Sequence, residues 1–527
     1  MTPQATSSER SRTHVRLAWA VAFAGALVLY VATLAPGLVW QDAGEYQVTS
    51  ARLSWPPTTD SVWCRPGEAV RVHPWFLVTA RALEALGPWD AAYAANLSSA
   101  VATALAVANV LALVYVLTGR LWPAIIAAAG FAVGHTVWRF AVLSEVLGWS
   151  AAFLSAECLC FWALRRHGRP RWLLLLFLLN GAAVSNHLMA GFSLVVFGGW
   201  AVVAFVRRRL PWWTLPAGAG CWLVGGTLYA VVVALEYVRT GSLAETLVSA
   251  TVGGYGGSVG NLAGLPTLLG RSVLYVGLTY PTPLVLAGLA GAWTLLRRGG
   301  GLGRVILILA AVYFLWAARY RVPDQYSFFV PFYVPASVLI GVGTARLLEG
   351  RWQRLRWAAL ALALVPVAVY AVLPAAARRA GLTTSPHDVP YRDEYRYFLQ
   401  PWRCGEDGPR RFAEETLSRL PRHAALFADT TVAPPLVYVQ VIEGRRPDVL
   451  LAAVGTRPPY LSREESRRYW RRAETFQALR AEGRRVFVAS DQPAYMPGWM
   501  VNHMRLEHVP VFEVLPKEAP AGEEGRR

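Results

Sequence analysis

The sequence predicts an α-helical protein that crosses a membrane many times and carries a small α/β domain at its C-terminal end. Of the 527 residues, 55% are hydrophobic and only 16% are charged, with a mean hydropathy of +0.34. Soluble domains usually carry about a quarter charged residues. The apolar residues form successive runs between residues 17 and 376, whereas residues 379–527 have the composition of a soluble domain. Both observations indicate a polytopic membrane protein with one appended domain.

Eleven apolar runs are candidate spans, because a helix needs roughly 20 apolar residues to cross a bilayer. The first run is too long for the apolar part of a signal peptide and shows no clear cleavage site, so we interpret it as a span. The run at 172–184 would reach only about 20 Å as a helix, so it must be kinked, tilted or buried against protein. The predicted spans are 17–38, 91–117, 122–138, 143–164, 172–184, 188–206, 212–238, 271–296, 303–319, 328–347 and 357–376.

Arginine indicates the orientation of these spans, because cytoplasmic loops collect basic residues. Arg10, Arg12 and Arg16 place the N-terminus in the cytoplasm, and alternation puts basic linkers such as 165–171 and 207–209 on the same side. An odd number of spans then leaves the C-terminal domain on the periplasmic or extracellular face of the inner (plasma) membrane. The arginine clusters account for the net charge of +18, so we predict the bilayer as a partner and no nucleic acid.

Nearly all side chains capable of chemistry lie in the segments predicted to face outward, whereas the inner loops offer almost only arginine. This one-sidedness predicts a reaction or binding site at the outer membrane–water boundary. The outward residues are Asp42, Glu45 and His73 in the first loop, His135, Arg139 and Glu145 around the third turn, Asn186 and His187 at the fourth, Tyr255 in a glycine-rich loop, and Arg319, Arg321, Asp324 and Gln325 in "ARYRVPDQYS".

Each of these residues also has a structural interpretation. Asp42 and Glu45 are spaced as in a capping box, and Glu145 at the start of a helix favours the helix dipole. His73 precedes a proline in a loop, and a buried Asn186–His187 turn would satisfy the broken backbone between two short helices. A structural account needs an unrelated reason at each of four turns, whereas a single site explains them together.

Glu157 is different, because it lies within a predicted span. An ionisable residue inside a membrane is by default a site candidate. Its position toward the inner side favours a structural role, paired with a hydroxyl group or an arginine.

The outward groups suit the transfer of a sugar from a polyprenyl-phosphate carrier to an acceptor outside the cytoplasm. Asp42 and Glu45 share a face if their segment is helical, and one carboxylate can take a proton from an incoming hydroxyl group. Arginines can hold a departing phosphate, and apolar grooves between spans can hold the lipid tail. A nucleotide-sugar donor would need a cytosolic binding domain, which the sequence does not show.

Five ordered motifs resemble the multi-spanning bacterial relatives of the eukaryotic plexin-type protein O-mannosyltransferase, in the GT-C superfamily of lipid-linked-sugar glycosyltransferases. They are "LAPGLVWQDAGEYQVTSARL", "HPWFLVTARALEALGP", "NLSSAVATALAVANVLALVYVL", "FAVGHTVWRFAVLSEVLGWSAAF" and "AAVSNHLMAG". The resemblance covers about 17–260 and continues more weakly through "DQYSFFVPFYV" into the C-terminal domain. It implies a GT-C-like fold and an inverting hexosyltransferase. The expected donor is polyprenyl-phosphate mannose, and the expected acceptor is a hydroxyl group on protein or glycolipid.

The resemblance also implies roles for individual residues. Asp42 matches the family's acidic motif after the first span and is the expected catalytic base, with Glu45 as its partner. His135 stands where the family more often has an acidic or small polar residue. The expected substrate-binding and donor-binding residues are His73, Arg139, Glu145, Asn186, His187, Tyr255, Arg321, Asp324 and Gln325.

One departure from the family concerns the loop after the acidic motif. The family usually places a His-Pro-Pro-Gly stretch there, but here "SWPPTTDSVWCRPGEAVRV" intervenes and His73 is followed by Pro74-Trp75. His73 is aligned because the apolar sequence after it fits, and Trp55-Pro56-Pro57 is a rival. The insertion lies where an acceptor would approach, so the acceptor stays unspecified.

The C-terminal region is predicted to be a small parallel α/β layer. The stretches "AALFAD", "DVLLAAV" and "RRVFVAS" are typical of short buried strands with helices between them. Asp429 follows the first strand, where capping of the next helix is favoured over ligand contact. The predicted parts of the chain are a basic cytoplasmic N-terminus at 1–16, the membrane domain at 17–378, a linker at 379–408, the α/β domain at 409–516 and a disordered tail at 517–527.

The cysteine and acidic residues bear on two further features, a disulfide bond and a metal site. Cys64 and Cys404 are the two cysteines expected outside, where an oxidising compartment permits a disulfide. No CxxC pair and no nucleotide-binding glycine motif occur, so no cofactor is expected. A divalent metal ion held by Asp, Glu and His is compatible with the sequence but is not required by it.

Two other functions are compatible with the same sequence. A transporter or flippase for a lipid-linked or polar solute also needs polar groups among its spans. Transporter sites, however, tend to lie near the midplane between repeated halves, and no second copy of the acidic motif occurs. A structural or assembly factor would not require the acidic first loop. The sequence therefore favours the enzyme.

Overall fold

The computed structural model describes residues 7–54, 69–253, 256–259, 264–385, 389–452, 473–489, 502–506 and 511–515. These residues lie in two compact units, and each is described by itself. The membrane unit consists of Met1–Ala35, Leu53–Leu382 and Tyr395–Cys404. The α/β unit consists of Pro36–Arg52, Thr383–Glu394 and Gly405–Arg527.

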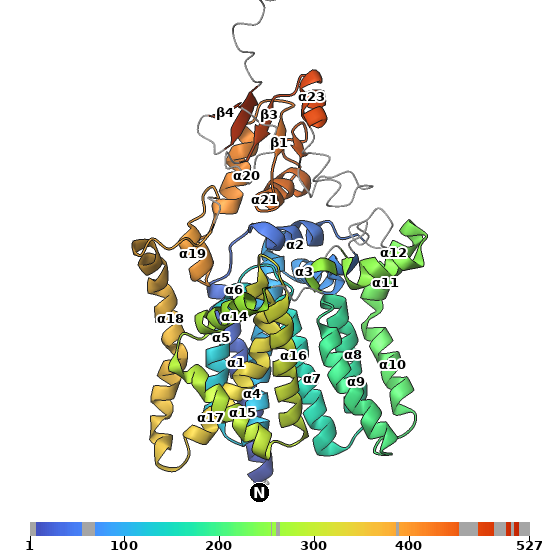
Figure 1. Ribbon diagram of the computed structural model, residues 1–527, viewed down its shortest axis with the longest axis vertical. Coiled ribbons are helices and arrows are strands. Elements are labelled where there is room, and N and C mark those ends of the chain that lie inside the picture. Colours follow the sequence, from blue (N-terminus) through green and yellow to red (C-terminus); the bar gives the residue numbers. More distant parts are fainter. Residues whose placement is uncertain are drawn as a thin grey trace, which may run out of the picture. The chain divides into compact units, whose positions relative to one another are not determined.

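The membrane unit is a bundle of apolar helices. Figure 1 shows its long helices running side by side, with shorter helices such as α6, α12 and α14 lying across one end. The helices are α1 (Ser7–Ala32), α3 (Pro74–Leu86), α4 (Ala91–Thr118), α5 (Leu121–Ala132), α6 (His135–Ala141), α7 (Leu147–His167), α8 (Arg171–Asn186), α9 (Ala190–Val206), α10 (Thr214–Gly225), α11 (Thr227–Thr240), α12 (Leu243–Thr251), α13 (Gly256–Val259), α14 (Leu265–Thr279), α15 (Ala287–Arg298), α16 (Gly301–Arg319), α17 (Val330–Leu347) and α18 (Arg356–Arg379). Helix α19 (Glu394–Leu399) begins at the boundary of the two units.

The chain is a multi-pass membrane protein, as predicted. Each predicted apolar run overlaps a helix. In the described part of the chain, six helices are long and apolar enough to cross a membrane, or up to nine if each of three bent pairs is one span. The expected number of eleven spans is therefore not confirmed.

The predicted span at 271–296 is not one straight helix. The chain turns by 120° between α14 and the helical segment Pro283–Arg298. Pro281 and Pro283 lie at this bend, and a proline without an N–H cannot continue a helix from the preceding turn. Apolar composition alone does not show such a bend.

The short run at 172–184 forms α8, which is buried against α10 as its length requires. A Cβ atom at Gly181 would lie 2.1 Å from the carbonyl oxygen of Trp222, and one at Gly225 would lie 2.1 Å from that of Leu178. The two helix backbones are therefore in direct contact. Small residues permit this approach, which supplies the van der Waals packing that associates helices in lipid.

The α/β unit contains a five-stranded sheet in the order β2-β1-β3-β5-β4. The three strands expected from sequence, β1 (Ala425–Phe427), β2 (Leu450–Ala452) and β3 (Val486–Val488), pair in parallel, as predicted. An antiparallel pair, β5 (Phe512–Leu515) and β4 (Asn502–Arg505), extends the sheet beyond β3 and was not predicted. The helices of the unit are α2 (Gln41–Ala51), α20 (Gly408–Arg419), α21 (Ala433–Val437), the π-helical turn η6 (Tyr438–Ile442) and α23 (Ala473–Ala481).

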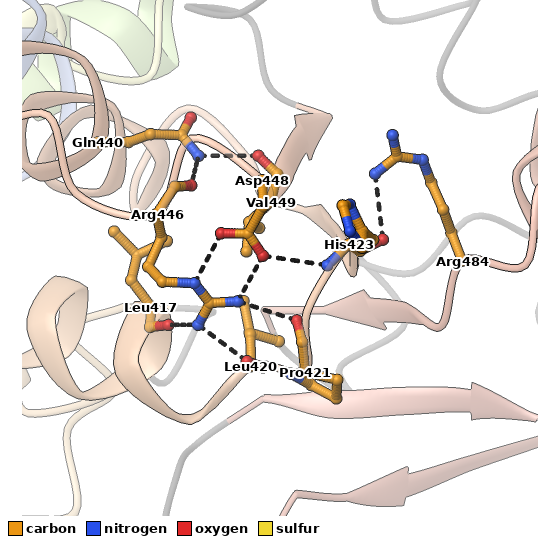
Figure 2. Close-up of polar contacts among 9 residues, drawn as sticks. All are labelled: Leu417, Leu420, Pro421, His423, Gln440, Arg446, Asp448, Val449 and Arg484. Carbon is orange, nitrogen blue, oxygen red and sulfur yellow. Dashed lines mark hydrogen bonds and ion pairs between the residues drawn. The ribbon is translucent and has the colours of Figure 1, made fainter.

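Arg446 ties the end of α20 to the start of β2 in the α/β unit (Figure 2). Its Nε and Nη2 atoms donate to the Asp448 carboxylate at 2.8 and 2.9 Å. Nη1 donates to the carbonyl oxygens of Leu417 and Leu420, and Nη2 also donates to that of Pro421. All five N–H groups of the guanidinium are thus used, and the last carbonyls of α20 gain the partners that a helix end lacks.

Two short segments lie in a different unit from the one that the sequence suggested. Residues 36–52, expected in the membrane domain, belong to the α/β unit, and 395–404, expected in the linker, belong to the membrane unit. Buried aromatic residues explain both. Trp40 packs against Phe412 in a tilted arrangement, with ring centroids 5.7 Å apart. The ring centroids of Trp402 and Trp138 are 5.3 Å apart.

Candidate active site

The expected catalytic pair, Asp42 and Glu45, lies on helix α2 of the α/β unit. The helix begins at Gln41, and its N-cap residue Trp40 makes no side-chain capping bond. Asp42 is therefore inside the first turn and is not the N-cap, so the capping-box interpretation does not describe this helix. Because the segment is helical, the two half-buried acids at i and i+3 share one face.

The start of α2 has a strained backbone that is held by hydrogen bonds. Gln41 has a φ of 62°, which is uncommon for a residue other than glycine, and its N–H donates to Thr431 O at 3.0 Å. The buried Gln47 side chain accepts from Val39 N at 3.1 Å and donates to Gly37 O at 2.9 Å. Strain that is over-determined in this way is typical of functional sites.

In the membrane unit, His73 and the Asn186–His187 turn come together across 113 residues of sequence. His73 lies in the left-handed region, with φ 49°, directly before α3. Its Nδ1–H donates to Asn186 O at 2.7 Å, and its ring stacks on that of His187 at 5.2 Å between centroids. The carbonyl partner places the His73 proton on Nδ1, so Nε2 is the acceptor in the neutral ring.

His187 has the opposite tautomer. Its Nδ1 accepts from Met189 N at 3.1 Å, so the proton of the neutral ring is on Nε2. Burial, with a smaller contribution from His73, lowers the pKa of His187 to about 3. The His187 ring is therefore neutral near pH 7 and offers an N–H donor.

Asn186 links the end of α8 to the start of α7. It is fully buried, and its Nδ2 donates to Val146 O at 2.9 Å and to Ser150 Oγ at 3.1 Å. Its Oδ1 has no hydrogen-bond partner in the described part of the chain. The structural interpretation of this turn therefore holds for the amide nitrogen, which joins α8 to α7.

Glu145 also makes local bonds at the start of α7. Its side-chain Oε1 accepts from Val146 N at 2.8 Å. Its backbone N–H donates to Ser99 Oγ at 2.8 Å, and Ser99 Oγ donates to its carbonyl oxygen at 2.9 Å. The half-buried carboxylate thus lies near the N-terminal end of α7, where negative charge is favourable.

Arg139 is buried in the membrane unit and contacts the segment that follows α18. Its guanidinium donates to Tyr397 O and lies 4.5 Å from the centroid of the Tyr397 ring. Arg403 donates to the same carbonyl oxygen. On the same helix as Arg139, the buried His135 packs edge-on against Tyr370 at 5.2 Å. Sequence reasoning missed the role of Tyr397 and Arg403, although the aromatic and basic pattern "YRYFLQPWR" could have indicated a packed segment.

The turn after α16 contains three further candidates, Gln325, Arg321 and Asp324, which differ in burial. Gln325 is buried, and its Nε2 donates to the carbonyl oxygens of Ala317 and Ala318, which ends α16. Arg321 and Asp324 are exposed. Gln325 thus has a structural role in this turn, whereas the two charged side chains face solvent.

Other candidates lie outside the described residues or away from this cluster. Tyr255, Cys64 and the rival Trp55-Pro56-Pro57 fall outside the described part of the chain, and Cys404 is exposed, so the disulfide stays a prediction. Among the described residues, no group of three or more His, Cys, Asp or Glu side chains is arranged to hold a metal ion. Metal dependence thus stays open.

Glu157 has the polar surroundings that its place in a span requires. It is fully buried in α7 and accepts from Asn180 Nδ2 at 3.1 Å. Asn180 also donates to Ser193 Oγ at 3.0 Å and accepts from Trp222 Nε1 at 3.0 Å. The partners are thus the amide of Asn180 and the hydroxyl group of Ser193. The hydroxyl partner was expected from sequence, and both partners are uncharged.

The arrangement of the chain matches a known class of fold. Comparisons with protein-family models and with curated proteins find no match. Solved structures, in contrast, match along nearly the whole chain, and they confirm the GT-C-like fold predicted from sequence.

Two of these structures are of ArnT from Cupriavidus metallidurans. The apo state matches with a TM-score of 0.56 and the state bound to undecaprenyl phosphate with 0.55, both at 15% identity over 94% of this chain and 97% of the other. A match with a TM-score of 0.49 and 12% identity, over 91% of this chain and 69% of the other, is archaeal oligosaccharyltransferase AglB from Archaeoglobus fulgidus in complex with an inhibitory peptide and a dolichol-phosphate. At these identities the similarity is one of fold.

Proposed function

We propose that the protein is a membrane glycosyltransferase that moves a sugar from a polyprenyl-phosphate carrier to a hydroxyl acceptor at the outer face of the inner membrane. The observation that carries the proposal is the meeting of His73 with the Asn186–His187 turn from distant parts of the chain, with stacked rings and a hydrogen bond between them. The fold supports it, because ArnT, which shares the fold over 94% of this chain, has been solved with undecaprenyl phosphate bound.

In this proposal Asp42 is the general base. It takes the proton of the acceptor hydroxyl group as the oxygen attacks the anomeric carbon of the sugar. The bond between that carbon and the phosphate oxygen breaks, and its electron pair leaves with the polyprenyl phosphate. A single displacement of this kind inverts the anomeric centre. Glu45, on the same face of α2, orients the acceptor or the base.

The two histidines are proposed to bind the sugar. His187 Nε2–H would donate to a sugar hydroxyl group, and the His73 ring stacked on it would line the same site. The phosphate is assigned to Arg321, which is exposed and can make charge-assisted bonds, with Asp324 beside it and Tyr255 as a further donor contact. Arg139, Glu145 and Gln325 are proposed to support this binding by holding the turns in place.

The resemblance to the bacterial relatives of protein O-mannosyltransferase supplies the finer proposal. It favours mannose as the sugar and a hydroxyl group on protein or glycolipid as the acceptor. The N-terminus is proposed to be cytoplasmic and the α/β unit periplasmic or extracellular, because the arginine-rich linkers lie on one side of the predicted spans.

Replacing Asp42 by asparagine tests the proposal. Asp42→Asn removes the base while keeping the shape of the side chain, so we expect transfer from a polyprenyl-phosphate sugar to fall about 10²- to 10⁴-fold. The variant should accumulate in the membrane at the normal level. The matched control is Glu245→Gln, another acid in the first turn of a helix, which should leave turnover unchanged. Normal turnover by Asp42→Asn would remove Asp42 from the mechanism.

A further inference from the structure

The helix that carries Asp42 belongs to the α/β unit and packs against its C-terminal part. Residues 36–52 group with 405–527 in one compact unit. Helix α2 packs against α21 and η6 within that unit. The position of the proposed base thus depends on parts of the α/β unit that begin at Thr383, far later in the chain.

A turn after strand β1 provides the first point of attachment. Asp429 Oδ1 accepts from the backbone N–H of Thr431 at 2.9 Å and of Val432 at 3.2 Å. This fixes the Thr431 carbonyl oxygen, which accepts from Gln41 N at 3.0 Å. Gln41 is the first residue of α2 and directly precedes Asp42. The carboxylate of Asp429 therefore sets, through one backbone turn, where α2 begins.

Close packing at Gly44 provides the second point of attachment. A Cβ atom at Gly44 would lie 2.8 Å from Cβ of Pro434 in α21 and 2.4 Å from Val39 O. Successive residues of an α-helix are about 100° apart around its axis. With Gly44 facing Pro434, Asp42 projects from nearly the opposite side of α2, and Glu45 projects about a quarter-turn from the contact. The contact thus fixes the rotation of the helix as well as its position.

We propose that Asp429 is a positioning residue for sugar transfer, and that its turn, together with Pro434, fixes the start and the rotation of α2 and so the direction of the Asp42 carboxylate. This inference rests on the proposed role of Asp42. It makes the α/β unit part of the catalytic machinery. A misplacement of about 1 Å can cost a hundredfold in rate even when its cause is remote from the reacting atoms.

Two substitutions of Asp429 in the full-length protein separate this role from others. Asp429→Ala removes the acceptor oxygen, whereas Asp429→Asn keeps an oxygen that can accept from Thr431 N. In Asp429→Ala we expect hydrogen exchange of the α2 amides to become about tenfold faster, since each such bond contributes about that factor. The amides of β1 should stay protected. Turnover should fall tenfold to a hundredfold with an unchanged KM for the lipid donor. Asp429→Asn should resemble the wild type in both measurements.

Gly44→Ala is a second variant that does not touch Asp429. Its new methyl group should loosen α2 from α21 and raise exchange of the same amides. The control is Gly37→Ala, where a Cβ atom meets nothing closer than Arg410 Nε at 3.9 Å. This variant should leave exchange in α2 unchanged, so the comparison remains possible if Asp429→Ala fails to accumulate.

The two proposals fail in different ways. Unchanged α2 exchange in Asp429→Ala and Gly44→Ala would overturn the positioning role even if Asp42→Asn is inactive. If Asp429→Asn showed normal exchange of the α2 amides but lost as much turnover as Asp429→Ala, the charge of Asp429 would act directly on the reaction. That result would also overturn the positioning role. Faster α2 exchange together with full activity of Asp42→Asn would support the attachment of α2 and reject Asp42 as the base.

Discussion

Two acidic residues, Glu157 in the membrane unit and Asp448 in the α/β unit, have partners of different kinds. In the membrane unit, Glu157 is bonded to the neutral amide of Asn180, and helices α8 and α10 meet through glycines. In the α/β unit, Arg446 bonds to the charged Asp448 and to three carbonyl oxygens. Water favours the association of apolar groups, and it solvates an ion pair that is partly exposed. Lipid does neither. At Glu157 and at the contact of α8 with α10, the membrane unit thus uses uncharged partners and close contact, whereas elsewhere it also holds charged groups such as Arg139 and the Glu236–Arg239 ion pair.

The largest expected effect tests close contact between helices of the membrane unit. Gly225→Ala places a methyl group 2.1 Å from Leu178 O, so α10 must move away from α8, and we expect a loss of about 2 kcal/mol in the free energy of unfolding. Gly220→Ala, on the same helix with nothing within 4 Å, should be neutral or slightly stabilising because alanine favours helix. Thermal unfolding of the detergent-solubilised protein compares them, and equal losses would contradict the role of contact.

A smaller effect tests the charged network of the α/β unit. The hydrogen-bonded Arg446, and less strongly the His423 N–H, hold the pKa of Asp448 well below its ordinary value. Its stabilisation is therefore present above the ordinary carboxylate pKa of about 4 and is lost as pH falls through the lower folded-state value. Asp448→Asn should cost about 1 kcal/mol at pH 7, because the site is partly exposed.

The difference between Asp448→Asn and the wild type should shrink as pH falls below about 4. Hydrogen exchange of the β1 amides in the full chain measures it. Arg445→Lys is the control, because Arg445 is exposed and its contacts with acids are 3.5 Å or longer. A pH-independent difference between the two proteins would reject the charged network as its cause.

The smallest effect is expected for the same acid-to-amide change inside the membrane unit. Glu157→Gln keeps an oxygen that accepts from Asn180 Nδ2 and replaces Oε2, which has no hydrogen-bond partner in the described part of the chain. Because a neutral side chain costs less to bury, we expect a change of less than about 1 kcal/mol, of either sign. Thermal unfolding at pH 7 measures it. A loss larger than that of Asp448→Asn would show that Glu157 is needed as a charge and would break the comparison.

Local patterns predicted most of the fold. Apolar runs placed the helices, and three short apolar stretches placed β1, β2 and β3. The sharp turn between α14 and α15 was missed, because apolar composition is the same on both sides of it. The antiparallel strand β5 was also missed, because its pairing with β3 depends on residues distant in sequence.

Local reasoning also found many candidate site residues, but not what each one contacts. It singled out His73, Asn186 and His187, which the fold brings together. It equally singled out Gln325, whose amide ends α16. All four are polar residues at turns. Only their contacts in the folded chain distinguish the histidines that meet across the membrane unit from Gln325, whose amide bonds to the backbone.

The sequence by itself determined the membrane class and the helical runs, because these depend on composition and on spacing within a few residues. It left the Asp42–Glu45 segment as a helix only by condition, which the structure then met. The tertiary structure alone decided that α2 belongs to the α/β unit, through Thr431 and Pro434. It also decided the tautomers of the two histidines. The placement of α2 and the His73 tautomer depend on contacts between residues more than a hundred positions apart, which no local pattern encodes. The His187 tautomer depends on its neighbour Met189 and required only the local backbone geometry.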